Sequence, residues 1–174
     1  MEERIPICKP TFGEEEYQAL RQTLASGWIG RGPRTLEFEE RFAEYIGVEY
    51  AVALNSATAA LHLAMLAAEV EGQEVLTTSM TFVSTNHAIL HGGGRPVFCD
   101  IEPDTLNIDP REIEKKITPT TRAIMVMHYG GHACDMDPIL ELARDHGLWV
   151  IEDTAQGCGG LYRDRGLGSM GDIG

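Results

Sequence analysis

Two hydroxyl residues stand close together in the segment Asn55-Ser56-Ala57-Thr58, between an apolar run that ends at Leu54 and a helical pattern over 59–70. A helix N-terminus presents unpaired backbone N–H groups and a partial positive charge, so it can bind a phosphate without a lysine. An ordinary N-cap at Asn55 or Ser56 is the alternative role, although it does not account for the second hydroxyl. The segment lacks the glycine patterns of a P-loop or of a dinucleotide site.

A carboxylate follows another apolar run, where 148–151 leads into Glu152-Asp153-Thr154-Ala155-Gln156. In open α/β sheets, ligands bind outside the carboxyl ends of the strands. Asp153 is therefore placed to pair with a cationic nitrogen of a ligand. A cap on the turn or helix after the strand is its alternative role.

An aromatic ring occupies a similar place in Thr81-Phe82-Val83-Ser84-Thr85, after the apolar run 74–78. Phe82 could stack on a flat ligand ring, and the alternative is an ordinary core aromatic. An anion-binding helix start, a ring face and a carboxylate at strand ends together suit a planar, phosphorylated heterocycle with a basic ring nitrogen. Pyridoxal 5′-phosphate (PLP) is such a molecule.

Short β-rich apolar runs separated by helical patterns predict an α/β fold with a largely parallel sheet. The runs lack polar and apolar alternation, as expected for strands covered by helices on both faces. Asp109-Pro110 and Asp137-Pro138 predict an N-cap and first residue for two of the helices, and Gly147 predicts the end of the second. The predicted strands are 50–54, 74–78, 96–101, 123–128 and 148–152.

The two ends of the chain differ from this central part. Helical patterns over 14–25 and 35–45, joined by the turn-prone segment 26–33, predict an N-terminal helical arm with a substrate loop over 1–46, packed across the sheet of a main domain over 47–174. The tail over 157–174 contains seven glycines and no apolar periodicity. We expect it to bury little surface by itself and to need a continuation.

The composition excludes several classes of protein. The 174 residues are 43% apolar, which is enough for a hydrophobic core, and the net charge of −13 opposes nucleic-acid binding. No signal peptide pattern or long apolar stretch is present, so the sequence predicts a cytoplasmic protein with no membrane segment. The four cysteines and six histidines lack metal-binding spacing, so we expect no metal site.

Motifs over nearly the whole chain resemble the DegT/DnrJ/EryC1/StrS family of PLP-dependent nucleotide-sugar aminotransferases. The resemblance implies the large domain of the aspartate-aminotransferase type (PLP fold type I), with a mixed seven-stranded sheet and a homodimer whose active sites lie at the interface. The clearest motifs are Ser-Gly-Trp-Ile-Gly-Arg-Gly-Pro at 26–33, Asn-Ser-Ala-Thr-Ala-Ala-Leu-His-Leu-Ala at 55–64, Met-Thr-Phe-Val-Ser-Thr at 80–85, Val-Ile-Glu-Asp-Thr-Ala-Gln at 150–156 and Gly-Ser-Met-Gly-Asp-Ile-Gly at 168–174.

The resemblance also implies roles for six residues of the cofactor site. The carboxylate would keep the ring nitrogen protonated, and a protonated pyridine ring is the electron sink of PLP chemistry. The implied positions are Ala57 and Thr58 with Ser56 beside them at the phosphate, Phe82 stacked on the ring, Asp153 at the ring nitrogen and Gln156 at the ring hydroxyl.

The lysine that forms the Schiff base in this family follows the Gly-Asp motif within a Ser-Phe-x-x-x-Lys segment, and this sequence stops at Gly174. Lys9, Lys115 and Lys116 do not match that position. We therefore name no catalytic residue and expect the 174 residues alone to be inactive. The sequence leaves open whether it is part of a longer enzyme, a split or truncated gene product, or a non-catalytic binding protein.

The implied function is transfer of an amino group, from glutamate or another amino acid, to a nucleotide-linked keto-sugar for surface polysaccharide or deoxyaminosugar synthesis. A PLP-dependent deoxysugar dehydratase of the same family, in which histidine replaces the lysine, is one alternative, and a ligand-binding or interaction protein is another. His128 and Tyr129, at the end of a predicted strand, could contact a substrate. The sugar, the nucleotide, the aminated position and the donor stay open.

Overall fold

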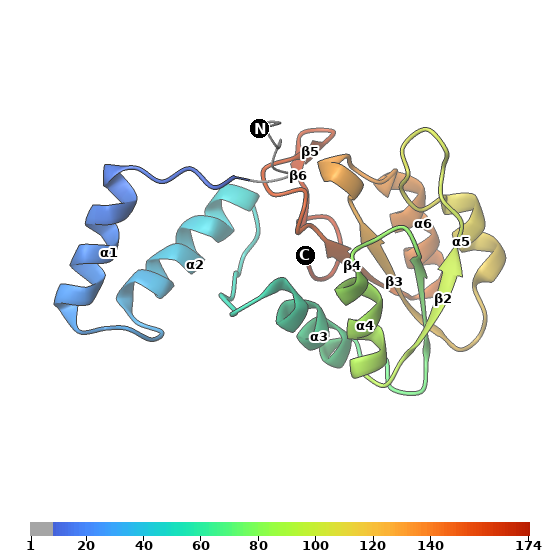
Figure 1. Cartoon of the computed structure of the whole chain (residues 1–174). Coiled ribbons are helices and arrows are strands. Elements are labelled where there is room, and N and C mark those ends of the chain that lie inside the picture. The colour runs from blue at the N-terminus through green and yellow to red at the C-terminus, as the bar shows by residue number, and fades with distance from the viewer. Residues whose placement is uncertain (1–8) are drawn as a thin grey trace, which may run out of the picture.

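A central sheet of four parallel strands, in the order β2-β1-β3-β4, organises the computed structural model, which describes residues 9–174 (Figure 1). A short antiparallel hairpin of β5 and β6 lies apart from it. The prediction of an α/β fold with a parallel sheet is confirmed. The strands are β1 (Glu74–Thr78), β2 (Arg95–Cys99), β3 (Thr121–Met127), β4 (Trp149–Asp153), β5 (Leu161–Tyr162) and β6 (Arg165–Gly166).

Helices cover both faces of the sheet. Alternate strand residues point to opposite faces, so Val75 packs in the cluster of α3 and α4, whereas Leu76 packs in the cluster of α5 and α6. Both clusters are fully apolar cores, which explains the unbroken apolar runs in the sequence. The helices are α3 (Ala57–Ala67) and α4 (Val83–His91) on one face, α5 (Pro110–Lys116) and α6 (Met136–His146) on the other, and the 3-10 turn η1 (Tyr129–Gly131).

One of the two predicted aspartate caps is confirmed and the other is wrong. Asp109 accepts a hydrogen bond from the backbone N–H of Arg111 at 2.8 Å at the start of α5. The N-cap of α6 is Asp135, whereas Asp137 lies in its first turn. The backbone N–H groups of the first helical turn have no acceptor within the helix, so proline, which lacks this group, fits at any position of that turn. Pro138 therefore does not fix the residue at which α6 begins. Gly147 ends α6 in the left-handed conformation, as predicted.

The predicted strand over 50–54 is not a strand in the structure. Tyr50 is 78% exposed, and no strand of residues 9–174 pairs with this segment. The free edge of β4 is already bonded by the tail, where the N–H of Glu152 donates to the carbonyl of Ile173 at 2.9 Å. A β-prone run forms a strand only when another backbone is available to complete its hydrogen bonds.

The arm consists of α1 (Glu14–Ser26) and α2 (Pro33–Ile46), which lie to one side of the sheet in Figure 1. No residue of α1 is buried, so the expectation that the arm packs across the sheet is wrong for α1, whereas α2 buries Glu39 and Ala43. The helices α3 and α4 already cover the adjacent face. Residues 1–8 of the predicted arm lie outside the described residues, and no helix of the described part is long and apolar enough to cross a membrane.

The glycine-rich tail buries more than expected. Leu167 and Met170 belong to the core cluster of α5 and α6. A Cβ atom at Gly171 would stand 2.6 Å from the carbonyl oxygen of Val150, so only glycine allows the tail to approach β4 this closely. The glycines therefore permit close backbone packing here, and the expectation of a poorly buried tail is wrong for these residues.

Candidate functional site

The site is built around Asp153, the last residue of β4, at the carboxyl edge of the sheet. Its side chain is 5% exposed. One carboxylate oxygen accepts a hydrogen bond from Thr85 Oγ1 at 2.7 Å, and the other accepts one from the backbone N–H of Ala155 at 3.1 Å. Thr85 lies in the first turn of α4, three residues after Phe82, so this bond joins two of the sequence-predicted segments.

The carboxylate of Asp153 keeps acceptor capacity for a ligand. A carboxylate has about four lone-pair positions. Donors from residues 9–174 fill two of them. A buried acceptor with open positions at the ligand-binding edge of a parallel sheet suits a protonated nitrogen of a ligand.

Phe82 is the N-cap residue of α4, and its side chain is 65% exposed. Phe82 is therefore not part of the core of the described residues. A ring held at a helix start and open to solvent can cover the face of a flat ligand. Phe82 also precedes Thr85 by three residues, so the same helical turn fixes the ring and the partner of Asp153.

Ser56 caps α3, because its hydroxyl accepts a hydrogen bond from the backbone N–H of Ala59 at 3.2 Å. The N-cap role is confirmed for Ser56 and is not taken by Asn55. Within residues 9–174, the N–H groups of Ala57 and Thr58 have no acceptor. These two N–H groups, with the exposed Thr58 hydroxyl, leave the helix start open to an anion.

Gln156 lies on the loop after β4, and its side-chain oxygen accepts a hydrogen bond from the N–H of Gly130 at 2.8 Å. This bond links the loops that follow β3 and β4. It also leaves the side-chain amide nitrogen of Gln156 as the group that can donate to a ligand oxygen.

An apolar cavity of about 890 Å³ lies between α2, α3, residues 48–54 and the tail. Ser56, Ala57 and Thr154 are among its lining residues. Thr58, Phe82, Asp153 and Gln156 are not. Ser56 and Ala57 thus line the cavity, and Asp153 directly precedes the lining residue Thr154.

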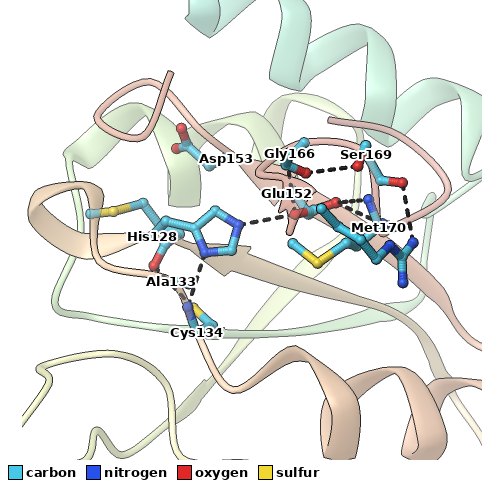
Figure 2. A network of polar contacts seen from close by, with 12 residues as sticks. His128, Ala133, Cys134, Glu152, Asp153, Gly166, Ser169 and Met170 are labelled. Carbon is cyan, nitrogen blue, oxygen red and sulfur yellow. Dashed lines mark hydrogen bonds and ion pairs between the residues drawn. The ribbon is translucent and has the colours of Figure 1, made fainter. Parts of the chain in front are cut away.

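The neighbour of Asp153 is part of a separate buried network on the opposite face of β4, shown in Figure 2. Glu152 accepts hydrogen bonds from His128 Nε2 and the N–H of Gly168, both at 3.0 Å, and from the N–H groups of Met170 and Gly171 at 2.7 and 2.6 Å. Burial by itself raises the pKa of Glu152, but these donors outweigh it and hold the pKa below its ordinary value.

His128 is fully buried between Glu152 and Cys134. Its Nδ1 accepts the N–H of Cys134 at 3.0 Å, so the ring is the neutral form that donates from Nε2. The interpretation of His128 as a substrate contact is wrong. The side chain instead ties the end of β3 to β4.

Two residues of these networks were not identified from the sequence. The sequence contains one indication for Thr85, since it stands three residues after Phe82 and so lies on the same helical turn. It contains another for Glu152, because neighbours on a strand point to opposite faces and cannot share a site. In neither case does the sequence show which donors the side chain meets.

The other candidate chemistry lies away from this edge. Lys115 and Lys116 are on α5, on the opposite face of the sheet, and Lys115 pairs with Glu112 at 2.6 Å. Within residues 9–174, no group of three or more histidine, cysteine or acidic side chains is arranged to hold a metal ion.

Comparisons with known proteins agree with this geometry. The model of the DegT/DnrJ/EryC1/StrS aminotransferase family matches residues 10–174. The spore coat polysaccharide biosynthesis protein SpsC of Bacillus subtilis is 47% identical over 169 residues, which are 97% of this chain and 43% of SpsC.

Solved structures give the same result. The aminotransferase TlmJ of Streptoalloteichus hindustanus is 41% identical with a TM-score of 0.92, covering 97% of this chain and 47% of TlmJ. An aminotransferase of Psychrobacter cryohalolentis is 38% identical with a TM-score of 0.91, covering 93% of this chain and 42% of that one. The chain therefore spans less than half the length of these relatives. Over the part that matches, its parallel sheet and helices have the same fold as theirs. On this match the chain belongs to the DegT/DnrJ/EryC1/StrS aminotransferase family.

Proposed function

We propose that the whole protein is a PLP-dependent aminotransferase that moves an amino group from an amino acid, such as glutamate, to a nucleotide-linked keto-sugar. Family membership supports the reaction class. The polysaccharide role in the name of SpsC supports a sugar substrate. Because the chain spans less than half of that relative, the activity is proposed for the protein and not for these residues alone.

The single observation that carries the proposal is the buried, half-filled carboxylate of Asp153 at the carboxyl edge of the sheet. When bound, PLP supplies an electron sink through its protonated ring nitrogen. Asp153 would hold the proton on that nitrogen, because a nearby carboxylate favours the charged form of a base.

The remaining site residues fit the rest of the cofactor. The free N–H groups of Ala57 and Thr58, the Thr58 hydroxyl and the cap residue Ser56 would hold the phosphate at the start of α3. The exposed ring of Phe82 would cover one face of the pyridine ring. The amide nitrogen of Gln156 would donate to the ring hydroxyl.

The same proposal divides the chain into an arm with a substrate loop over 1–46 and a cofactor domain over 47–174. In the loop, Arg31 pairs with Glu39 at 2.9 Å, and Glu39 also accepts the N–H of Ala53 at 2.9 Å. These bonds hold the loop near residues that line the cavity. The cavity side of the loop is where we place the sugar substrate.

We propose a cytoplasmic homodimer as the working form. Large apolar side chains are exposed on α1 and on α3, and an exposed apolar surface of this kind suits contact with a second copy. These residues are Tyr17, Leu20, Leu24, Leu63 and Leu66.

The 174 residues alone are expected to be inactive. The reaction needs a lysine as nucleophile and proton carrier at the cofactor. Lys115 and Lys116 project from α5 on the other face of the sheet, and Lys9 lies in the arm, before α1.

The test uses the protein in the full length that its gene encodes. Transfer of ¹⁵N from labelled glutamate to a panel of nucleotide-linked keto-sugars is followed by mass spectrometry, and bound cofactor by visible absorbance. We expect Asp153→Asn to lower kcat by about a hundredfold, since loss of a charged hydrogen bond at the ring nitrogen raises the barrier by about 3 kcal/mol.

Asp145→Asn, on the exposed surface of α6, is the matched control and is expected to retain full activity. Absence of bound cofactor would contradict the proposed cofactor. Bound cofactor without transfer to any keto-sugar would contradict the substrate class.

A further inference from the structure

A chain of hydroxyl groups leads to Asp153 from α4. Thr85 Oγ1 stands 2.7 Å from the Asp153 carboxylate and 2.7 Å from Thr81 Oγ1. Thr85 is fully buried, and Thr81 is half-buried at the turn before the helix. None of these contacts follows from the family roles of Phe82 and Asp153.

The direction of each hydrogen bond is fixed by chemistry. An ionised carboxylate only accepts, so the single hydroxyl proton of Thr85 points to Asp153. The Thr85 oxygen is then the acceptor for Thr81, whose own proton completes the chain. Both hydroxyls are therefore oriented towards the carboxylate.

The two oxygens of Asp153 are held from different elements. The N–H of Ala155 binds one oxygen from the loop after β4, and Thr85 binds the other from α4. Two donors on opposite oxygens restrict rotation of the carboxylate plane. The remaining lone pairs consequently keep a fixed direction.

We propose that Thr85 is a positioning residue that aims the Asp153 carboxylate at the ring nitrogen of the cofactor, with Thr81 orienting the Thr85 hydroxyl. The inference rests on the proposed function. The first turn of α4 then fixes both the ring of Phe82 and the hydroxyl that binds Asp153, since Phe82 begins the turn and Thr85 lies on it. The alternative is a structural role, in which the bond to Asp153 only provides a hydrogen-bond partner for the buried Thr85 hydroxyl.

The experiment measures equilibrium affinity for pyridoxamine 5′-phosphate (PMP) in the protein of full gene-encoded length. PMP carries an amine in place of the aldehyde and forms no Schiff base, so its affinity reports noncovalent contacts. A second probe is the analogue of PMP in which C–H replaces the ring nitrogen. The analogue cannot bind Asp153 through a ring N–H.

We expect Thr85→Val, which keeps the shape but loses the hydroxyl, to weaken PMP binding about tenfold. Thr85→Ser restores the donor and is expected to stay within about threefold of the unsubstituted protein. Affinity for the analogue should be the same in all three proteins. Ser84→Ala, the neighbouring position on α4, is the matched control and should change neither affinity.

A second variant guards against misfolding of Thr85→Val. Thr81→Val leaves the bond between Thr85 and Asp153 in place and is expected to weaken PMP binding about threefold. Its effect should also be absent with the analogue.

The outcomes separate this inference from the function on which it rests. Equal losses for PMP and the analogue in Thr85→Val would show a structural role only and overturn the inference. Normal PMP affinity in Thr85→Val together with a loss in Asp153→Asn would overturn it and leave the proposed function standing. No PMP binding by the unsubstituted protein would overturn both.

Discussion

Glu152 and Asp153 are consecutive acids at the end of β4, and they point to opposite faces of the sheet. Their burial is similar, at 2% and 5% exposed. Glu152 receives four donors from the chain, whereas Asp153 receives two. Because a carboxylate has about four acceptor positions, Glu152 is saturated and Asp153 is not. Acceptor capacity, rather than burial or charge, separates the structural acid from the ligand-binding one.

The donors also come from different kinds of structure. Three of the four donors to Glu152 are backbone N–H groups of the glycine-rich tail, and the fourth is a buried histidine. Both donors to Asp153 come from segments at the edge of the sheet. The tail thus fills one face of β4 and leaves the other face to a ligand.

The largest expected effect on stability is that of Glu152→Ala. Removing the carboxylate leaves four buried donors without an acceptor. The free energy of unfolding should fall by about 4 kcal/mol as a result. Urea denaturation followed by circular dichroism measures the change. Glu141→Ala, at an exposed position on α6, is the control, and an equal loss in both variants would contradict the structural role of Glu152.

Acidification should remove part of the contribution of Glu152 to the free energy of unfolding. The pKa of Glu152 is lowered in the folded protein, so its contribution is present above the ordinary value of 4.5 and is lost as the pH falls through the lowered pKa. We expect the free energy of unfolding to fall with pH between about pH 5 and pH 3, and Glu152→Gln to flatten this dependence. Urea denaturation at several pH values tests this, and an unchanged slope in the variant would assign the acid sensitivity to other groups.

Substitution of the histidine should have an intermediate effect. His128→Leu removes one donor to Glu152 and the acceptor for the N–H of Cys134, and it should cost about 2 kcal/mol. His132→Leu, with an exposed side chain, serves as the control. Thermal and urea denaturation of both variants are compared with the unsubstituted protein. A neutral His128→Leu would mean that the other three donors suffice for Glu152.

Asp153→Asn is expected to have the smallest effect on stability. The asparagine oxygen still accepts a hydrogen bond, and the site is not saturated, so the loss should stay below about 1 kcal/mol. Its large effect belongs to cofactor binding and activity. A loss as large as that of Glu152→Ala would make Asp153 a structural acid and remove the contrast between the two neighbours.

Local patterns predicted the elements of the sheet well. The run 74–78 coincides with β1, the runs 96–101, 123–128 and 148–152 overlap β2, β3 and β4, and Asp109 caps α5 as expected. The exception, 50–54, has the right composition but no backbone partner among residues 9–174. Propensity describes a segment by itself, whereas a strand requires a second segment.

The places of Phe82 and Asp153 on the fold were predictable from the sequence, whereas their roles at a cofactor stay predictions. The locations of Phe82 and Asp153 followed from their places after strands, and the structure joins their elements through Thr85. The roles of Ser56, Ala57, Thr58 and Gln156 stay predictions, supported by the free helix start and by the orientation of the Gln156 amide.

The sequence by itself placed Glu152 and Asp153 at the end of an apolar, strand-forming run, because such a run is a local pattern. Only the tertiary structure decided which of the two is saturated. The donors to Glu152 lie 16 to 24 residues away in the chain, and Thr85 lies 68 residues from Asp153. Hydrogen bonds over such separations depend on how the elements pack, and no local pattern encodes them.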